Sequence, residues 1–357
     1  MRLLDPTRLA RHACVRLIVC CAALVATLAA ALIHPVARPA EAQTNALKVA
    51  LDWRFEGPSA LFLMPQEKGY YRQEGLEVTV DEGATSLEAI TRVGSGTYDI
   101  GFADINTLIK YRDEHPSAPV KAVFMIYNKP AFAVVGRKSR GVSEPKSLEG
   151  KKLGAPYTSS SYAQWRLFAK LNDIDAAKIT IENIAVPVRE PMLAAGQLDA
   201  VLGYSFRVYV DLKDRGVPVD DIVLLPMANY GLSLYGAAIL VNSKFAAEKP
   251  EALKGFLNAF VKGTKDTIRS PAGAIEVLVK REDSLKKDVE LERLRMALRD
   301  NILTPEVRAN GLGGIDNSRF EEAINQLALT SSFKTKPRLE DVFDASFLPA
   351  AAERKVH

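Results

Sequence analysis

Between residues 47 and 242, short apolar runs alternate with amphipathic stretches in which apolar residues recur every three or four positions. The short runs are typical of buried strands and the longer stretches of helices, so the alternation predicts βαβ units and a doubly wound sheet. The predicted strands cover residues 47–53, 76–80, 100–103, 120–127, 132–136, 152–155, 179–185, 200–203, 222–225 and 237–242. These are too many strands for one compact sheet.

An internal repeat indicates how the strands divide. The stretches "AITRVGSGTYDIGFAD" (89–104) and "REPMLAAGQLDAVLGYS" (189–205) both run from a helix through Gly-x-x-Asp into a short apolar strand. In each, the glycine can end the helix in a left-handed conformation. The alternative is coincidence, because Gly-x-x-Asp is a short pattern. We predict two lobes of the same kind.

The order of the elements predicts an α/β fold with a doubly wound mixed sheet in each lobe and two hinge crossings. The chain would leave the first lobe near residues 131–136 and return near 235–242. Lobe 1 would comprise residues 44–133 and 238–357, and lobe 2 residues 134–237. Two crossings beside a cleft predict hinge closure around a small ligand.

The first 42 residues differ from the rest of the chain. Apolar residues fill 17–33, and Ala40-Glu41-Ala42 matches the small-x-small pattern of a secretory cleavage site. Four arginines precede the apolar stretch: Arg2, Arg8, Arg11 and Arg16. We expect residues 1–42 to be a cleavable signal peptide and the protein to be periplasmic. The alternative is an uncleaved anchor, since about 17 to 20 apolar residues can span a bilayer.

Composition after residue 42 excludes several classes of function. The three cysteines, Cys14, Cys20 and Cys21, all precede that point, so the remaining chain has no thiol for catalysis, disulfides or metal binding. Five arginines and two acids also precede it, which leaves 42 basic against 41 acidic side chains. The near-neutral balance and the scattered histidines indicate neither a nucleic-acid surface nor a metal site.

The candidate ligand site follows from the predicted strands. In open α/β sheets, ligands bind beyond the carboxyl ends of strands, so the residues after each strand are candidates. Lobe 1 contributes Asp52, Trp53, Phe55, Ser59, Thr85, Ser86, Asp104, Asn106, Tyr127 and Asn128. Lobe 2 contributes Tyr157, Thr158, Ser159, Ser160, Arg189, Tyr204 and Tyr230.

Hydroxyl side chains gather at residues 158–161. If Ser161 caps the following helix together with Gln164, the hydroxyls of 158–160 stay free to donate to an anionic or strongly hydrogen-bonding ligand. The alternative is an ordinary solvated turn. Thr85 and Glu88 form a second predicted capping box.

Arg189 and Trp53 each have two interpretations. The Arg189 guanidinium can bind a carboxylate or sulfonate through two parallel hydrogen bonds, or it can form a salt bridge with Glu190 or another acidic residue of lobe 2. The Trp53 ring can stack on a planar ligand or fill the core.

Five stretches in order carry a family resemblance. They are "LDWRFEGPSALFLMPQEKGYYRQEGLEVTV", "VGSGTYDIGFAD", "SLEGKKLGAP", "AAGQLDAVLGY" and "LVNSKFAAEKPEALKGFLNAF", within residues 46–265. Together they resemble the superfamily of nitrate, alkanesulfonate and taurine-type solute-binding proteins of ABC importers. This superfamily also holds the thiamine pyrimidine synthases of the NMT1 type and bacterial proteins that bind pyrimidine precursors of thiamine. The resemblance implies a two-lobed periplasmic-binding-protein fold with the ligand between the lobes.

Departures from the family pattern bear on activity. The pyrimidine branch has a histidine where this chain has Ser59, which weakens the expectation of a pyrimidine ligand. The synthases have a cofactor-binding lysine where this chain has Ala103, and a cysteine-rich iron-binding run that would fall on residues 230–240. Since these nucleophile and metal ligands are missing, we expect no enzyme activity, no cofactor and no metal.

The expected function is therefore that of an exported solute-binding protein of an ABC importer. A sulfonate, an aromatic carboxylate and a pyrimidine are the candidate ligands. The expected partners are this small molecule and a permease in the inner membrane, with no nucleic acid, and the protein would be a monomer. The alternatives are an enzyme similar to the thiamine pyrimidine synthases and a sensor subunit that reports the ligand to a membrane kinase.

Overall fold

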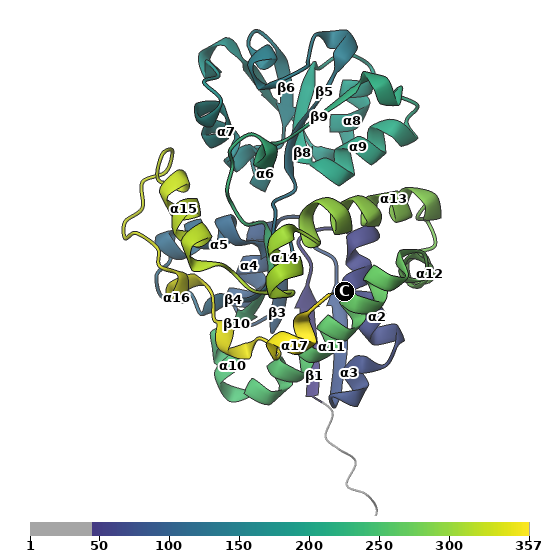
Figure 1. Ribbon diagram of the computed structural model, residues 1–357, viewed down its shortest axis with the longest axis vertical. Helices are drawn as coiled ribbons and strands as arrows, with labels where there is room; N and C mark the ends of the chain where they lie inside the picture. The colour runs from purple at the N-terminus through teal and green to yellow at the C-terminus, as the bar shows by residue number, and fades with distance from the viewer. Residues whose placement is uncertain (1–44, 357) are drawn as a thin grey trace, which may run out of the picture. The chain divides into compact units, whose positions relative to one another are not determined.

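Two five-stranded mixed sheets organise the computed structural model, which describes residues 45–356 (Figure 1). The predicted signal peptide, residues 1–42, lies outside the described residues. The first sheet has the order β2-β1-β3-β10-β4 and the second the order β7-β6-β8-β5-β9. In the first sheet β10 runs antiparallel to β3 and β4, and in the second β5 runs antiparallel to β8 and β9. The predicted α/β fold with two mixed sheets is confirmed.

The strands lie close to their predicted positions. They are β1 (Asn45–Ala50), β2 (Leu76–Asp81), β3 (Ile100–Asp104), β4 (Val120–Met125), β5 (Phe132–Arg137), β6 (Lys152–Ala155), β7 (Thr180–Asn183), β8 (Ala200–Tyr204), β9 (Ile222–Pro226) and β10 (Ala237–Asn242). The sheet that contains β1, together with the helices that follow its strands, is called the first lobe. The sheet that contains β6, together with the helices that follow its strands, is called the second lobe. The residue bounds predicted for the lobes remain a prediction.

Helices connect the strands and extend the chain after β10. The α-helices are α2 (Ala60–Glu67), α3 (Tyr70–Gln73), α4 (Ser86–Gly94), α5 (Ile105–Glu114), α6 (Ser160–Ala163), α7 (Trp165–Leu171), α8 (Val186–Ala194), α9 (Ser205–Asp214), α10 (Ser243–Glu248), α11 (Pro250–Arg269), α12 (Pro271–Arg281), α13 (Lys287–Ala297), α14 (Pro305–Asn310), α15 (Asn317–Leu327), α16 (Leu339–Val342) and α17 (Ala351–Arg354). A π-helical turn follows α13 at Leu298–Ile302. Short 3₁₀ turns occupy Gly57–Ser59, Lys138–Arg140, Pro145–Leu148, Ala176–Lys178, Val219–Asp221, Met227–Asn229 and Ala345–Phe347. Within residues 45–356, no helix combines the length and the apolar character needed to span a bilayer.

The internal repeat has a structural basis. Gly96 and Gly196 adopt φ of 76° and 71°, in the left-handed region that glycine tolerates. Three residues later, the carboxylate of Asp99 accepts a hydrogen bond from the backbone N–H of Lys48 at 2.9 Å, and that of Asp199 accepts one from Lys152 at 2.9 Å. The two sheets also have the same strand order when β1, β2, β3, β4 and β10 are matched with β6, β7, β8, β9 and β5. The repeat is therefore a repeat of fold.

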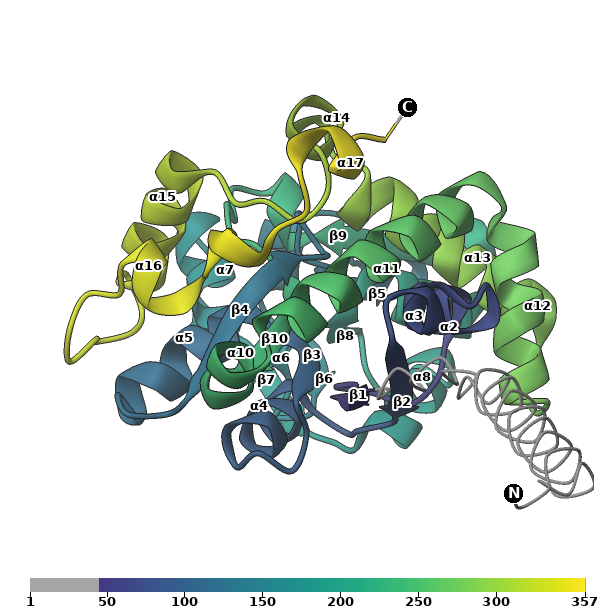
Figure 2. The ribbon, with the colours of Figure 1, turned by 90° about the horizontal axis from the view of Figure 1, so that it is seen from below.

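Aromatic side chains pack the core of the first lobe. α2 and α11 lie together against the sheet (Figure 2), and their apolar faces share one buried cluster with it. The Phe62 ring lies 5.0 Å from Phe260, and the Tyr71 ring stacks on Phe256 at 5.3 Å between centroids. This packing gives the strand ends of the first lobe a rigid base.

Two segments, 126–131 and 227–236, connect the two sheets. Arg319 of α15 donates hydrogen bonds from one nitrogen to the carbonyl oxygens of Asn128 and Leu234, at 2.7 and 2.8 Å. One guanidinium thus joins both connecting segments.

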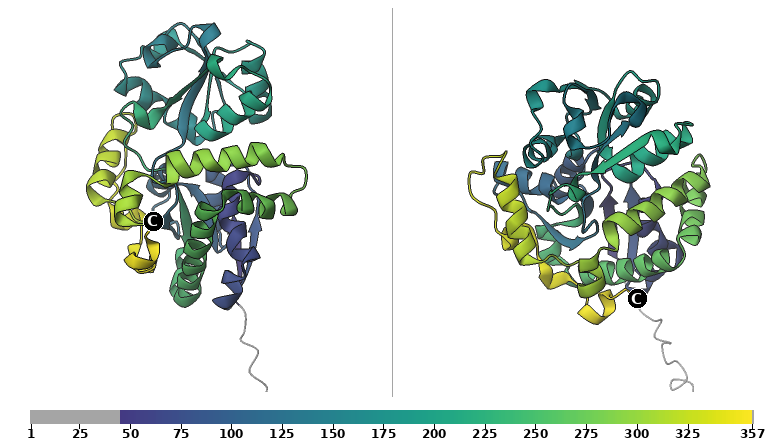
Figure 3. Two further views of the ribbon diagram at one scale, coloured as in Figure 1. Left: turned by 45° about the vertical axis from the view of Figure 1, so that its right-hand side comes forward. Right: turned by 45° about the horizontal axis from the view of Figure 1, so that its top comes forward.

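A second contact between the lobes is formed by helices. α13 of the first lobe packs against α9 of the second (Figures 1 and 3). Three ion pairs cross this contact: Arg293 with Asp211 at 2.5 Å, Lys213 with Glu292 at 2.8 Å, and Lys286 with Asp214 at 2.8 Å.

Candidate functional site

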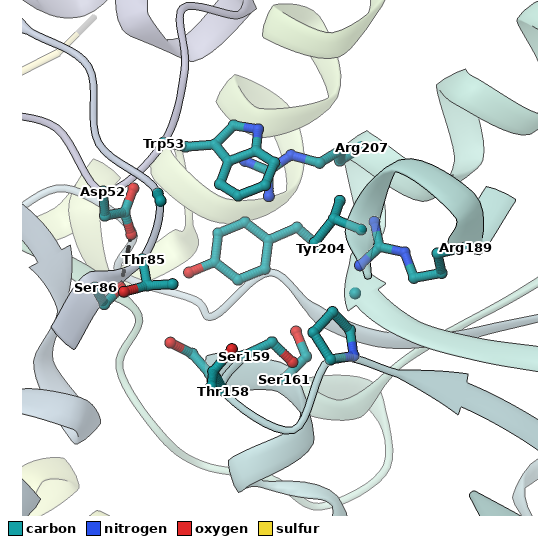
Figure 4. A pocket seen from close by; sticks show the side chains of 15 residues that line it. Asp52, Trp53, Thr85, Ser86, Thr158, Ser159, Ser161, Arg189, Tyr204 and Arg207 are labelled. Atoms are coloured by element: carbon teal, nitrogen blue, oxygen red, sulfur yellow. Dashed lines mark hydrogen bonds between the residues drawn. The ribbon is translucent and has the colours of Figure 1, made fainter. Parts of the chain in front are cut away.

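A cavity of about 530 Å³, partly open to solvent, lies where strand ends of both lobes meet (Figure 4). The loops after β1 and β2 line it from the first lobe, and the loop after β6, the end of β8, and helices α8 and α9 line it from the second. Its lining residues are Asp52, Trp53, Ala84, Thr85, Ser86, Pro156, Thr158, Ser159, Ser160, Ser161, Val186, Arg189, Gly203, Tyr204 and Arg207. We call it the main cavity.

The structure brings many of the predicted site residues together. The main cavity is lined by Asp52, Trp53, Thr85, Ser86, Thr158, Ser159, Ser160, Arg189 and Tyr204. A smaller side cavity of about 320 Å³ adds Ser59 and Tyr127 and shares four lining residues with the main one, Asp52, Trp53, Tyr204 and Arg207. Asn106 and Tyr157 line a wider groove of about 1980 Å³ beside α5 and α7. Ligand contact by these residues stays a prediction.

The other four predicted residues line none of these three spaces, and each has a structural partner. Phe55 lies under the Arg281 guanidinium, and the Tyr230 ring meets the Phe168 ring edge-on. The Asn128 side chain bonds to Glu306, Thr304 and Arg319. Asp104 caps α5 by accepting the N–H of Thr107 at 2.9 Å. Asp104 is the last residue of β3 and the other three follow a strand, but all four side chains have their contacts within the protein.

Asp52 places a carboxyl group on the wall of the main cavity. It is 8% exposed and accepts a hydrogen bond from the Ser86 hydroxyl at 2.7 Å. Burial raises the pKa of Asp52 to about 6, although the Ser86 hydrogen bond and the Arg207 charge oppose this rise. At neutral pH the carboxyl is therefore mostly ionised.

Arg207 is the charged residue of the cavity that the sequence reasoning missed. Its guanidinium lies over the Trp53 ring at 4.6 Å and over the Tyr204 ring at 5.1 Å. It also donates two hydrogen bonds to the Glu56 carboxylate of the other lobe, at 2.9 and 2.5 Å. Burial alone would raise the pKa of Glu56, but Arg207 outweighs it and holds this pKa below its ordinary value. The pair is ionised on both sides.

The position of Arg207 explains why it was missed. From the predicted strand at 200–203 only Tyr204 was considered, whereas Arg207 lies in the first turn of α9, three residues after the end of β8. A signal was present, because the first turn of a helix that follows a strand lies at the same sheet edge as the loop.

Arg189 forms an ion pair with Glu190, which is the second of the two interpretations given for it above. It is 2% exposed, and its Nε donates to the Glu190 carboxylate at 2.9 Å while another nitrogen donates to the Leu202 carbonyl at 3.1 Å. It still lines the main cavity, as part of a neutral ion pair.

The hydroxyl cluster differs from the prediction in its capping residue. Ser159, not Ser161, caps α6, because the helix begins at Ser160 and the Ser159 hydroxyl accepts the N–H of Tyr162 at 3.2 Å. Ser161 lies inside the helix, so the predicted cap is wrong. Thr158, Ser160 and Ser161 remain on the cavity wall. Thr85 accepts the N–H of Glu88 at 3.1 Å, as predicted.

Comparison with known proteins assigns the family. Residues 58–274 match the sequence profile of the family described as "NMT1/THI5 like", which covers more than half of the chain. The chain belongs to the NMT1/THI5-like family. This confirms the resemblance found in the sequence.

Relatives of this chain are named for different functions. The chain is 25% identical over 241 residues to a 4-amino-5-hydroxymethyl-2-methylpyrimidine phosphate synthase of Schizosaccharomyces pombe, covering 64% of this chain and 67% of the relative. It is 24% identical over 306 residues to the formylaminopyrimidine-binding protein of Halalkalibacterium halodurans, covering 84% and 89%. It is 28% identical over 271 residues to the riboflavin-binding protein RibY of Chloroflexus aurantiacus, covering 73% and 74%.

Solved structures show the same fold at low identity. The alkanesulfonate-binding protein SsuA from Xanthomonas axonopodis pv. citri superposes with a TM-score of 0.62 and 16% identity, covering 85% of this chain and 97% of that one. The nitrate-binding protein NrtA from Synechocystis PCC 6803 gives 0.63 and 12%, covering 85% and 87%. The predicted periplasmic-binding-protein fold is therefore confirmed.

The positions at which this member departs from the family pattern have structural roles here. The Ser59 hydroxyl accepts the N–H of Glu56 at 3.2 Å and lines the side cavity. Ala103 is fully buried in β3, opposite Ala238 of β10. Within residues 45–356, no group of three histidine, cysteine, aspartate or glutamate side chains is placed to hold a metal ion.

Proposed function

We propose that the protein is an exported solute-binding protein of an ABC importer, which closes its two lobes on a small organic ligand. The observation that supports this function most is the main cavity, because strand-end residues of both lobes line it. Two connecting segments allow a hinge motion between the lobes. A ligand that contacts both lobes would bind the closed form more tightly and so shift the population toward it.

The location and partners belong to the same proposal. The features of residues 1–42 support export to the periplasm, where a closed, liganded monomer would deliver its ligand to a permease in the inner membrane. Relatives named as binding proteins for a formylaminopyrimidine and for riboflavin support a soluble ligand as the cargo. The rings of Trp53, Tyr127 and Tyr204 would suit a planar ligand.

A synthase similar to the fungal relatives is the competing function, since those relatives are named as enzymes. The residues at two decisive positions favour the receptor: Ala103 and Ser59 offer no amine and no imidazole. Incubation with pyridoxal phosphate and borohydride distinguishes the two functions. We expect no covalent pyridoxyl adduct on an active-site lysine by mass spectrometry, and an adduct at one of the cavity loops would support the synthase.

The receptor function is tested with a ligand screen on the purified protein, because a ligand that binds only the folded state raises the melting temperature. With any ligand found, Trp53→Ala should weaken binding about fivefold or more, since a lost stacking contact is worth about 1 kcal/mol or more. Val219→Ala, an exposed apolar site in a turn of the second lobe, is the matched control and should not change affinity. Equal affinity of wild type and Trp53→Ala would contradict the site.

The sensor alternative shares the cavity and differs in its partner. Deletion of the permease that works with this protein distinguishes a transport receptor from a sensor. A transport receptor would then no longer support uptake of radiolabelled ligand, whereas a sensor would still alter gene expression when the ligand is added.

A further inference from the structure

We propose that the Glu56–Arg207 ion pair is a latch that holds the two lobes closed by the protein's own contacts, before any ligand binds. Arg207 acts in it as a positioning residue, because it joins the Trp53 ring of the first lobe to the Tyr204 ring of the second. The latch goes beyond the proposed receptor function, since it needs neither a ligand nor a permease.

Arg207 belongs to α9 of the second lobe, but its hydrogen-bonding partner belongs to the first. Its guanidinium donates to both carboxylate oxygens of Glu56, at 2.9 and 2.5 Å. It also lies 4.6 Å from the centre of the Trp53 ring, as Figure 4 shows, and 5.1 Å from that of Tyr204. A cation over an aromatic face is attracted to it, so one guanidinium links the aromatic walls that both lobes give to the main cavity.

Burial decides whether this pair favours the closed form. The side chains of Glu56 and Arg207 are 8% and 12% exposed, and their attraction must exceed the cost of removing both charges from water. At Glu56, burial raises the pKa, but the charge and hydrogen bonds of Arg207 outweigh burial and lower it. At Arg207, burial lowers the pKa, but the charge and hydrogen bonds of Glu56 outweigh burial and raise it. Each charge is therefore more stable in the pair than in water.

The first lobe holds Glu56 in a fixed position. The backbone N–H of the next residue, Gly57, donates to the Glu290 carboxylate of α13 at 2.6 Å. α13 lies so close to this turn that a Cβ atom on Gly57 would collide with the backbone of Glu290 and Leu294. The turn cannot shift with α9 without disturbing this packing, so separation of the lobes must break the pair.

The other ion pairs between the lobes lie along the same face of α9. Residues 207, 211 and 214 are four and three positions apart, which places them on one side of the helix. Among residues 45–356, every ion pair between the lobes uses a residue of α9. Exposure rises away from the cavity, since Asp211 is 23% exposed and Lys286, the partner of Asp214, is 68% exposed. Water and salt screen the outer pairs, so the latch depends mainly on Arg207.

The test measures the distance between the lobes in the absence of a ligand. Leu87 and Val188 are 50% and 45% exposed, and each is next to a residue that lines the main cavity, in the first and second lobe respectively. Both are replaced by cysteine and spin-labelled. The native cysteines are replaced by serine, so that only these two sites react; they are Cys14, Cys20 and Cys21. Native mass spectrometry confirms that no small molecule is bound, and double electron–electron resonance then gives the distance distribution.

Glu56→Gln removes one charge of the latch and keeps the size of the side chain. At pH 7.5 we expect a single short distance in the labelled protein without this change, and an added longer distance with it. The ratio of open to closed molecules should rise about tenfold or more, because two hydrogen bonds between charged groups are weakened. Glu292→Gln is the matched control, since it removes the charge of an exposed pair between the same lobes and should leave the distribution unchanged.

A second variant separates the latch from a general role in folding. Arg207→Lys keeps the positive charge but loses the two parallel hydrogen bonds, so its open fraction should lie between those of the unchanged protein and Glu56→Gln. Circular dichroism confirms that each variant is folded under the conditions of the distance measurement. If Glu56→Gln is not folded, Arg207→Lys alone decides, by its open fraction relative to the control.

Two outcomes would overturn the latch. A long distance in the unchanged, unliganded protein would mean that its lobes rest open. The same distribution in the latch variants as in Glu292→Gln would mean that other contacts hold the lobes together. Either outcome leaves the receptor function standing, because a ligand can still close the lobes, whereas failure of every compound in the ligand screen would count against the receptor function and not against the latch.

Discussion

Asp52 shows, at the scale of single residues, how a buried carboxyl group on a cavity wall can reduce stability. Burial raises the pKa of Asp52 to about 6 from an ordinary value of 3.8. Since the folded state binds the proton more tightly than the unfolded state, the charge on Asp52 opposes folding wherever the carboxyl is ionised. A difference of about 2 in pKa corresponds to about 3 kcal/mol.

Asp52→Asn should therefore stabilise the unliganded protein at neutral pH. Below about pH 4 the carboxyl is protonated in both states, so no gain is expected there. The gain should grow between pH 4 and pH 6 and reach up to about 3 kcal/mol above pH 7. Urea denaturation of wild type and Asp52→Asn at pH 4 and 7.5 measures it, with Glu248→Gln as control. A gain of equal size at both pH values would show that charge burial is not its cause.

Some of the residues near the cavity could be predicted from the sequence, and others could not. Asp52, Trp53 and Tyr204 were found because they lie at or just beyond the carboxyl end of a strand. The Glu56–Arg207 pair was not, since the two residues are 151 positions apart and belong to different lobes. The capping residue was assigned wrongly because Ser159 and Ser161 offer the same local chemistry, and only the start of α6 distinguishes them.

At the scale of elements, each Gly-x-x-Asp motif joins a helix to the neighbouring strand. The glycine reverses the chain after α4 or α8, and the aspartate then bonds to the N–H of an adjacent parallel strand. The aspartate side chain of each motif thus joins the start of one strand to the neighbouring strand in the same way in both lobes.

Gly96→Ala should destabilise the protein by about 1 kcal/mol, because alanine is strained at the left-handed φ of this position. Gly94→Ala, two residues earlier at the end of α4, is the matched control. A side chain there would meet the Tyr111 hydroxyl at an ordinary 3.6 Å, so we expect no loss of stability. Thermal and urea unfolding of both variants provide the comparison. Equal losses in both would mean that the turn tolerates alanine.

Strand positions were predictable from hydrophobic periodicity, and strand ends less so. The predicted first strand continued to Trp53, but β1 ends at Ala50. The apolar run continues because Leu51 is buried, while the chain itself turns toward the cavity. Periodicity reports burial, so it does not separate a strand from the buried loop that follows it.

For the whole molecule, the contacts between lobes lay beyond what the sequence could predict. The contact of α9 with α13 depends on packing two segments that are far apart in the chain. The ion pairs between the lobes differ in burial: Glu56 with Arg207 is buried at the cavity, whereas Lys213 with Glu292 is exposed at the edge of the α9–α13 contact. We expect these pairs to contribute very different amounts to the free energy of unfolding.

Arg207→Met should lower the free energy of unfolding by about 3 kcal/mol or more, because it leaves the Glu56 carboxylate buried without a partner. The double variant Glu56→Gln with Arg207→Met should recover part of the loss, since neither charge remains. Lys213→Met should cost less than about 1 kcal/mol. Urea denaturation of the four proteins at pH 7.5 measures these differences. Similar losses for Arg207→Met and Lys213→Met would contradict the assigned burial.

The single guanidinium of Arg319 between the two connecting segments restricts how the lobes can move. Because it bonds to the carbonyls of both Asn128 and Leu234, we expect these segments to move together in the proposed hinge closure. The expected motion of the second lobe is then mainly a rigid-body rotation about an axis near that side chain. Open and closed conformers should therefore superpose lobe by lobe, and differ by a single angle.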